Sequence, residues 1–398
     1  MVCLMNYKNI FSLLMGHFAN YLVPFSMIFI LSRSLNQSDF TFFMYAQVVL
    51  VWSGMFIEYG FTLRAIRYLK QADFDVFALY NLIQSTKLVL ASFSTILVMV
   101  ILYFSGLSTI YNYFLVCLIF VFFGFRANWY FIALEKTSVM TIVDLIVSIL
   151  FVSVLFFINN SNLTYVLMLM VLYRLIPALI HFTIVSNVRK IRLVTLQDII
   201  NELRAGFSLF LHVFSVSFYS TFNSLYLGLV FQGNVIVNYI NAERLNNIAV
   251  GIYYPIVNAF IPRIMAGDKR VRKIAGIVII SYSLLCIFGV YMFGEFFIKL
   301  LFSDKYLNSI GILKTLCFVI PFIGLNYFIG QLVLIPLGLE KLIAKVTLIA
   351  AGINVSLLLL FINITHSIVF LPYLVIGIEV LISILLLLVC VKRRVFND

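Results

Sequence analysis

Long apolar stretches, separated by short polar segments, follow one another along almost the whole chain of 398 residues. A helix of about 20 apolar residues crosses the hydrocarbon core of a bilayer. Most of these stretches are continuous and lack the two-residue alternation of barrel strands, which predicts helices. Twelve stretches are long enough: 10–31, 40–63, 77–105, 109–134, 139–158, 164–186, 207–231, 236–262, 274–302, 310–337, 342–362 and 367–391.

Composition excludes a soluble protein. The chain is 64% hydrophobic and 11% charged, whereas soluble domains carry about 25% charged residues. We expect the first stretch to stay in the protein, because it is longer than a signal peptide and only Lys8 precedes it. The sequence therefore predicts an all-α membrane protein of about twelve transmembrane helices.

The positive charges predict the orientation of these helices. With twelve spans both termini lie on one side, and that side carries nineteen of the 27 Lys and Arg residues. The opposite loops carry four, and the remaining four lie within spans. Cytoplasmic loops are enriched in Lys and Arg, so both termini are predicted to be cytoplasmic. The net charge of +12 then reflects topology and anionic lipids, and we expect no nucleic acid partner.

The two halves of the chain are similar. A shift of 196 residues places 11–18 on 207–214, with Phe11, Ser12, Leu13 and Phe18 matched by identical residues. Chance similarity between apolar helices is the alternative, but Leu134-Glu135-Lys136 also recurs as Leu339-Glu340-Lys341. Six spans per half give parallel repeats, an arrangement of transporters with a central cavity. We expect an N-terminal bundle (1–186), a cytoplasmic linker (187–206) and a C-terminal bundle (207–398).

No cofactor is predicted. The five cysteines and the histidines His17, His181, His212 and His366 lack metal-ligand spacing, and each histidine is interpreted as a hydrogen-bonded helix residue rather than a proton relay. No nucleotide-binding loop is recognisable, so direct ATP drive is not expected.

Ionisable residues inside spans are the candidate functional residues, because a central Lys or Arg costs about 2.5–3.5 kcal/mol to insert. Lys87 follows Asn81 and Gln84 at three-residue spacing, which predicts a polar stripe. The stripe lines a cavity or packs against another polar helix. Arg126 either faces the cavity or snorkels to the cytoplasmic surface.

The remaining candidates lie in later spans. Arg174 precedes Pro177, where a kink is expected, and is interpreted as a contact for a pyrophosphate or an acidic sugar, or as an ion-pair partner of Asp144 or Glu58. Arg244 lies in a polar segment of the eighth span with Asn241 and predicts a cavity wall. The possible ion-coupling or ion-pair acids are Glu58, Asp144, Glu243 and Glu379.

Several short motifs resemble one family, the O-antigen (Wzx-type) polysaccharide flippases of the multidrug/oligosaccharidyl-lipid/polysaccharide exporter superfamily. They are Asn20-Tyr21 with Pro24, Glu58-Tyr59-Gly60-Phe61, Asn128-Trp129-Tyr130-Phe131 running to Leu134-Glu135-Lys136, Tyr239-Ile240-Asn241-Ala242-Glu243-Arg244-Leu245, and Gln331 with Pro336-Leu337-Gly338-Leu339-Glu340-Lys341. Departures are Ile132-Ala133, where a Gln-Gly type pair is frequent, and Asn223, where Asp is common.

The resemblance implies a function. It implies a flippase that moves an undecaprenyl-pyrophosphate-linked oligosaccharide from the cytoplasmic to the periplasmic leaflet of a bacterial inner membrane. It also implies contacts with membrane lipids and, as a hypothesis, with other membrane proteins of polysaccharide assembly. A buried sugar hydroxyl without a partner costs several kcal/mol, so such a protein needs a polar cavity.

Two other functions stay open. A related exporter of drugs or of another lipid-linked precursor would share the two-bundle plan. A membrane polysaccharide polymerase or acyltransferase would need a sizeable polar loop or a His/Arg/Asp cluster, whereas the loops 159–163 and 232–235 are short and almost uncharged.

Overall fold

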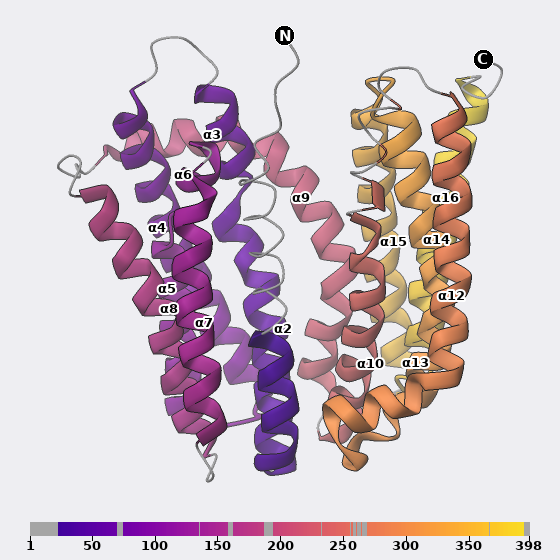
Figure 1. Ribbon diagram of the computed structural model, residues 1–398, viewed down its shortest axis with the longest axis horizontal. Coiled ribbons are helices and arrows are strands. Elements are labelled where there is room, and N and C mark those ends of the chain that lie inside the picture. The colour runs from indigo at the N-terminus through magenta and orange to yellow at the C-terminus, as the bar shows by residue number, and fades with distance from the viewer. Residues whose placement is uncertain are drawn as a thin grey trace. The chain divides into compact units, whose positions relative to one another are not determined.

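The part of the chain that the structure describes is helical (Figure 1). The computed structural model describes residues 23–69, 75–134, 136–157, 162–186, 194–231, 233–254, 256–257, 260, 264, 269–365 and 367–393. Nine helices in these ranges are long and apolar enough to cross a membrane, and Val23–Ser34 is a shorter apolar helix. The protein is therefore an all-helical membrane protein, as predicted.

Close contacts divide the chain into two compact units, 1–214 and 215–398. In unit 1, α5 packs against α4 and α8, α2 packs against α4, and α3 packs against α6. Its helices are α2 (Gln37–Glu58), α3 (Phe61–Leu69), α4 (Val76–Ser105), α5 (Ile110–Phe125), α6 (Asn128–Ala133), α7 (Thr137–Phe157), α8 (Leu163–Ser186) and the first part of α9 (Leu196–Val230).

Unit 2 begins within α9 and packs α10 against α13, α12 against α14, and α16 against α14 and α15. Its elements are α10 (Asn234–Gly251), α12 (Lys269–Phe302), η1 (Asp304–Tyr306), α13 (Ser309–Leu316), η2 (Cys317–Val319), α14 (Ile320–Tyr327), η3 (Phe328–Leu334), α15 (Glu340–Thr365) and α16 (Leu371–Lys392).

Local sequence explains the ends of α2. The Asn36 side chain accepts a hydrogen bond from the Asp39 N–H at 2.8 Å and caps the first turn. At the other end, Tyr59 has φ 41° and Gly60 has φ 80°. Left-handed backbone ends helices and suits glycine, so the chain turns here and enters the short helix α3.

Two predicted spans differ from the helices observed. The stretch 109–134 is not one helix, because α5 ends at Phe125 and α6 begins at Asn128. The break contains Arg126 and is followed by Asn128, but the stretch as a whole is apolar enough to be read as one span. The helix predicted from 207 begins at Leu196, where the Thr195 hydroxyl accepts a hydrogen bond from the Asp198 N–H, as at a helix N-cap.

A third predicted span, 310–337, is segmented. It contains α13, a 3₁₀ turn (η2), α14 with Pro321 in its first turn, and the seven-residue π-helix η3. By contrast, α8 continues as a helix through Pro177.

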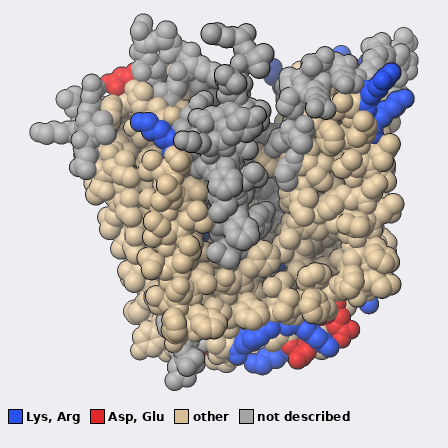
Figure 2. All heavy atoms as spheres, in the orientation of Figure 1, with Lys and Arg blue, Asp and Glu red and all other residues tan. Residues whose placement is uncertain are grey.

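The surface suits a membrane. Large apolar side chains are exposed along the long helices, for example Phe93 and Phe104 of α4. On the face drawn in Figure 2, Lys, Arg, Asp and Glu lie near the ends of the helices, and other residues form the described surface between them.

Some sequence features lie outside the described residues. These are His17, Asn20, Tyr21, Glu135, His366 and positions 187–193 of the predicted linker, together with the side chains of His212 and Glu340.

Candidate functional site: two polar clusters

The break between α5 and α6 is held by polar side chains of α4. Gln84 Nε2 donates to the carbonyl oxygens of Gly124 and Phe125 at 3.1 and 3.0 Å. The Trp129 indole donates to Gln84 Oε1 through a long bond of 3.4 Å. Carbonyls freed by a break in a transmembrane helix need such partners, because hydrocarbon offers none.

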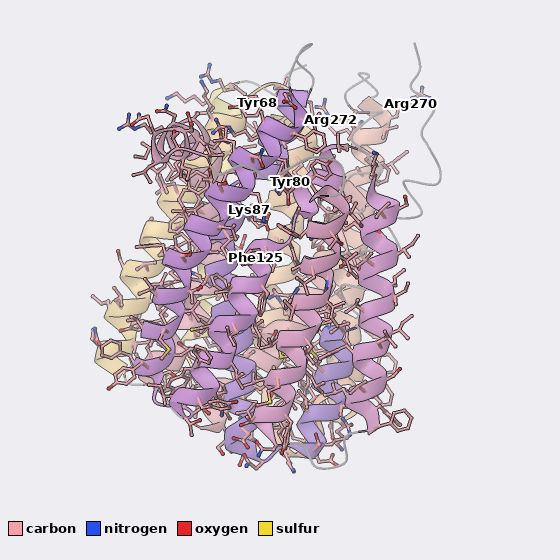
Figure 3. The ribbon with its side chains drawn as sticks, turned by 90° about the vertical axis from the view of Figure 1, so that its left-hand side faces the viewer. Tyr68, Tyr80, Lys87, Phe125, Arg270 and Arg272 are labelled. Carbon is pink, nitrogen blue, oxygen red and sulfur yellow. The ribbon has the colours of Figure 1, made fainter. Side chains whose placement is uncertain are left out.

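Lys87 also donates a hydrogen bond at this break. It is almost fully buried, with 1% of its side chain exposed. Its Nζ donates to the Arg126 carbonyl at 3.1 Å and forms an ion pair with Glu58 Oε1 at 3.2 Å. Figure 3 shows Lys87 between Tyr80 and Phe125 inside unit 1. Glu58 is the last residue of α2, so this contact also joins α2 to α4.

Arg126 lies in the break itself and pairs with Asp144 of α7. Its Nη2 is 2.6 Å from Asp144 Oδ1 and 2.7 Å from Oδ2. The Arg126 side chain is 9% exposed, so it does not snorkel to the surface. The sequence predicted charges at these positions but not the pairs Lys87–Glu58 and Arg126–Asp144.

Arg174 of α8 has a different environment. Its guanidinium lies over the rings of Tyr173 and Phe123, at 5.2 and 5.7 Å from their centres, a cation–π arrangement. Its Nε has no hydrogen-bond partner, and no ion pair to Asp144 or Glu58 is present among the described residues. Arg174 therefore contacts aromatic rings, whereas Lys87 and Arg126 are paired with acids.

His181 lies beside this cluster. It is fully buried, with its ring 4.7 Å from that of Phe131. Neither ring nitrogen has a hydrogen-bond partner among the described residues, so the interpretation as a hydrogen-bonded helix residue is wrong for His181. The described residues contain no group of three or more His, Cys, Asp or Glu placed to hold a metal ion.

Asn81 is separated from Gln84 and Lys87. It lines an open pocket with residues of α3 and the start of α9, whereas Gln84 and Lys87 face the helix break. The predicted stripe therefore serves two sites.

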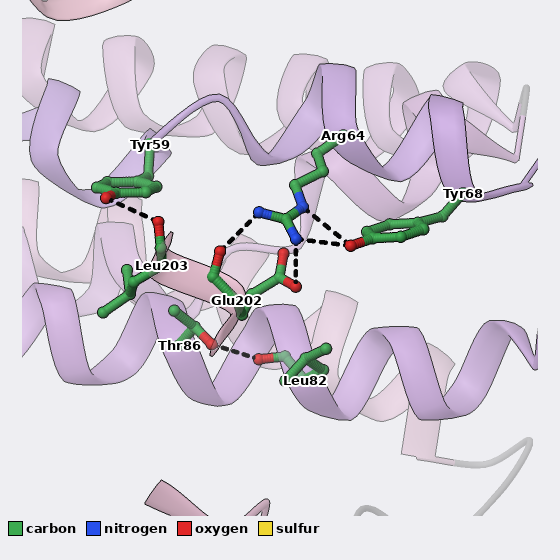
Figure 4. Close-up of polar contacts among 7 residues, drawn as sticks. All are labelled: Tyr59, Arg64, Tyr68, Leu82, Thr86, Glu202 and Leu203. Carbon is green, nitrogen blue, oxygen red and sulfur yellow. Dashed lines mark hydrogen bonds and ion pairs between the residues drawn. The ribbon is translucent and has the colours of Figure 1, made fainter. Parts of the chain in front are cut away.

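Sequence reasoning missed a contact that ties α3 to α9 (Figure 4). Arg64 Nη2 lies 3.0 Å from Glu202 Oε2, and Arg64 Nη1 donates to the Glu202 carbonyl at 2.6 Å. The Tyr68 hydroxyl accepts from Arg64, and the Tyr59 hydroxyl donates to the Leu203 carbonyl at 3.1 Å. We call these four side chains, Tyr59, Arg64, Tyr68 and Glu202, the α3–α9 clamp.

The clamp requires close approach of the helices. A Cβ on Gly206 would lie 2.9 Å from Arg64 Nη1 and 3.2 Å from the Tyr59 ring. Burial raises the pKa of the Glu202 carboxyl above its ordinary value, and the Arg64 charge offsets only part of that rise. The one sequence signal was that Glu202 follows a helix start in the predicted linker.

Unit 2 holds a second polar cluster, around a small cavity of about 60 Å³. Glu243 of α10 and Glu379 of α16 line it together with Asn223, Asn246 and Asn354. Such a volume holds one or two water-sized groups. The two acids predicted from sequence therefore meet at one cavity.

Neutral side chains hold these acids. Ser224 donates a hydrogen bond to Glu243, and Asn326 Nδ2 donates to Glu379 Oε2 at 2.7 Å. The amides of Asn354 and Asn223 bond each other at 2.9 Å.

Asn241 lies two residues from Tyr239 and Glu243 of the cavity lining and is fully buried. Its amide nitrogen and oxygen have no partner in the described part of the chain. Buried amides are nearly always hydrogen-bonded, so this position is unusual within unit 2.

Comparison with known proteins adds to this geometry. The model of a family described as polysaccharide biosynthesis protein matches residues 7–268. A "Putative O-antigen transporter" of Shigella dysenteriae is 25% identical over 359 residues, covering 87% of this chain and 90% of the relative. One of the same description from Escherichia coli K12 is 26% identical, covering 89% of both.

Solved structures share the fold. A multidrug resistance MATE family transporter of the MOP superfamily, in its inward-facing conformation, aligns with a TM-score of 0.63 at 12% identity and 94% coverage of both chains. A MOP superfamily transporter from Pyrococcus furiosus aligns with a TM-score of 0.57 at 13% identity, covering 97% of this chain and 94% of that one. The relatives and the fold are those of transporters rather than enzymes. The resemblance drawn from the sequence motifs is confirmed.

Proposed function

Because the chain belongs to the family of polysaccharide biosynthesis proteins, we propose that it flips a lipid-linked oligosaccharide, an O-antigen repeat unit on undecaprenyl pyrophosphate, from the cytoplasmic to the periplasmic leaflet. The observation that carries the proposal is similarity over almost the whole chain to the two relatives described as "Putative O-antigen transporter". The transporter fold supports it.

The proposal includes the topology. Twelve spans, with both termini cytoplasmic and the halves 1–186 and 207–398 joined by a linker at 187–206, would enclose one cavity that opens to each side in turn. Reporter fusions after each predicted span test the count and the orientation.

The substrate carries negative charge on its pyrophosphate, and Arg174 is our proposed contact for it. Lys87 and Arg126 already have acid partners, so their charge is largely neutralised within unit 1. Arg174 lies over two aromatic rings, and no acid among the described residues is within ion-pair distance of it. We therefore expect Arg174→Ala to lower flipping much more than Arg174→Lys.

Glu243 and Glu379 are the proposed coupling acids. They line one cavity, in which Ser224 donates a hydrogen bond to Glu243 and Asn326 donates one to Glu379. Glu58 and Asp144 instead form ion pairs with cations of unit 1. Flipping by Glu243→Gln and Glu379→Gln, measured across imposed proton and sodium gradients, tests this role. Unchanged gradient dependence in both variants contradicts it.

The deciding experiment combines cells and vesicles. Deletion of the gene is expected to remove surface polysaccharide and to accumulate lipid-linked glycan facing the cytoplasm. The purified protein in proteoliposomes is expected to expose that glycan to an external glycosidase. Accumulation of exported drugs in the deletion strain, with normal surface polysaccharide, would instead identify a drug exporter.

A further inference from the structure

A pocket of about 580 Å³ lies within unit 1, where the first turns of α4 and α9 meet the end of α3. Its volume falls in the range of about 300–1,000 Å³ that is typical of small-molecule sites. Its walls belong to one compact unit, and the ion pairs around the α5–α6 break do not use it.

Glu202 supplies the feature that points to a ligand. The residue is 3% exposed and lines the pocket. Its Oε2 is engaged by Arg64, but its Oε1 has no hydrogen-bond partner among the described residues. A buried carboxylate oxygen without a donor costs about 1–3 kcal/mol or more, so a ligand that donates a hydrogen bond there relieves this cost.

The charges of the lining select the class of ligand. The described lining residues include one cation, Arg64, and two carboxylates, Asp198 and Glu202. Because Arg64 is already paired, the pocket disfavours a phosphate or pyrophosphate. Asn81 and Asn201 add amide groups and Tyr68 adds a ring face, the side chains that suit hydroxyl groups and a sugar ring.

The position of the pocket along the helix axis agrees with a sugar as the ligand. Asn81 lies five residues after the first residue of α4, which corresponds to about 8 Å along the helix axis. The α9 side of the wall begins at Val194, before the first helical turn. The pocket therefore lies near the helix ends at the predicted cytoplasmic side, where the glycan of a lipid-linked substrate would lie before transport.

We propose that this pocket binds a neutral sugar residue of the glycan through its hydroxyl groups, as an entry site before translocation. The inference rests on the proposed function and deepens it. The glycan is recognised here, and the pyrophosphate is bound elsewhere.

The test measures binding apart from transport. The full-length protein in nanodiscs is titrated with the free oligosaccharide released from the lipid-linked glycan by mild acid, and binding is followed by saturation-transfer NMR. Ala78→Trp and Ala205→Trp each fill the pocket from an exposed position. Leu196→Trp is the matched control, because Leu196 is exposed on α9 but does not line the pocket.

We expect both filling variants to weaken binding about tenfold or more, equivalent to loss of about one strong polar contact, and the control to bind like the parent. Inorganic pyrophosphate should not compete. Parent-like binding by both folded filling variants, or competition by pyrophosphate at the concentration of the sugar, would overturn the inference. Flipping of the parent in proteoliposomes decides the proposed function separately, so the two failures are distinguishable.

Discussion

The two units differ in the partners that hold their ionisable side chains. In unit 1, Lys87 and Arg126 are neutralised by Glu58 and Asp144, and they are tied to the α5–α6 break. In unit 2, Glu243 and Glu379 face one cavity and are held by Ser224 and Asn326. Removing one member of a buried ion pair leaves the other charge uncompensated and is strongly destabilising. An acid that accepts from neutral donors can instead be replaced by an amide that keeps the hydrogen bond. The same type of residue is therefore paired with a cation in unit 1 and held by neutral hydrogen-bond donors in unit 2.

The largest expected loss of stability comes from breaking the Arg126–Asp144 pair. Asp144→Ala leaves the Arg126 guanidinium buried without its counter-charge and is expected to destabilise the protein by about 3–5 kcal/mol. Denaturant unfolding in mixed micelles measures this change. Adding Arg126→Met should recover most of the loss.

A matched control is the exposed pair Glu295–Lys299 of α12. Glu295→Ala removes an ion pair in water and is expected to cost at most about 1 kcal/mol. Equal losses for Asp144→Ala and Glu295→Ala would show that the buried pair has no special structural role.

The next effect concerns the helix break. Gln84→Leu leaves the carbonyls of Gly124 and Phe125 without their side-chain donor, at an expected cost of about 2–3 kcal/mol. Ser92→Ala, at an exposed position of the same helix, is the control and should change the unfolding free energy little. An unchanged unfolding free energy for Gln84→Leu would mean that other groups donate to these two carbonyls.

A smaller effect on stability is expected in unit 2. Glu243→Gln and Glu379→Gln each keep an oxygen that accepts from Ser224 or Asn326, so the unfolding free energy should change by no more than about 1 kcal/mol. Losses as large as that of Asp144→Ala would make these acids structural and would remove the contrast between the units.

The smallest effect is the pH dependence of the α3–α9 clamp. The pKa of Glu202 is raised when α9 is docked on α3. The carboxyl therefore binds its proton more tightly with α9 docked than with α9 detached. Docking is then strongest below the ordinary pKa of glutamate and weakens as the pH rises through the raised value. Hydrogen exchange of 196–206, corrected for the intrinsic rate, should show falling protection over this interval. Glu202→Gln should remove the dependence, and protection that rises with pH would contradict it.

Hydrophobic length predicted most of the fold, because each membrane crossing requires a long apolar run. It could not predict the break after Phe125, because the long run around it is apolar as a whole. The partners that satisfy the break, Gln84 and Lys87, are about 40 positions earlier. Pairing between helices depends on tertiary packing, which one sequence does not encode locally.

Helix geometry explains why the polar stripe divides between two sites. Asn81 and Lys87 are six residues apart and so lie about 120° apart around the helix axis. That angle places them on different faces of α4, one toward α9 and one toward the break. Arg64 and Glu202 were overlooked as a pair because both belong to segments read as cytoplasmic, where charges are usually solvated.

The π-helix η3 affects how the sequences of relatives align with this chain. A π turn accommodates one more residue than an α turn in the same axial length, and such turns are rare outside functional sites. Relatives that lack one residue in 328–334 would close this segment into a regular helix. Every later position of that helix would then rotate by about 100° relative to Asn326. Gaps in alignments of this region therefore belong inside the helix, at 328–334. A change of length there reorients the side chains that follow, whereas a change of length in a loop leaves their orientation unchanged.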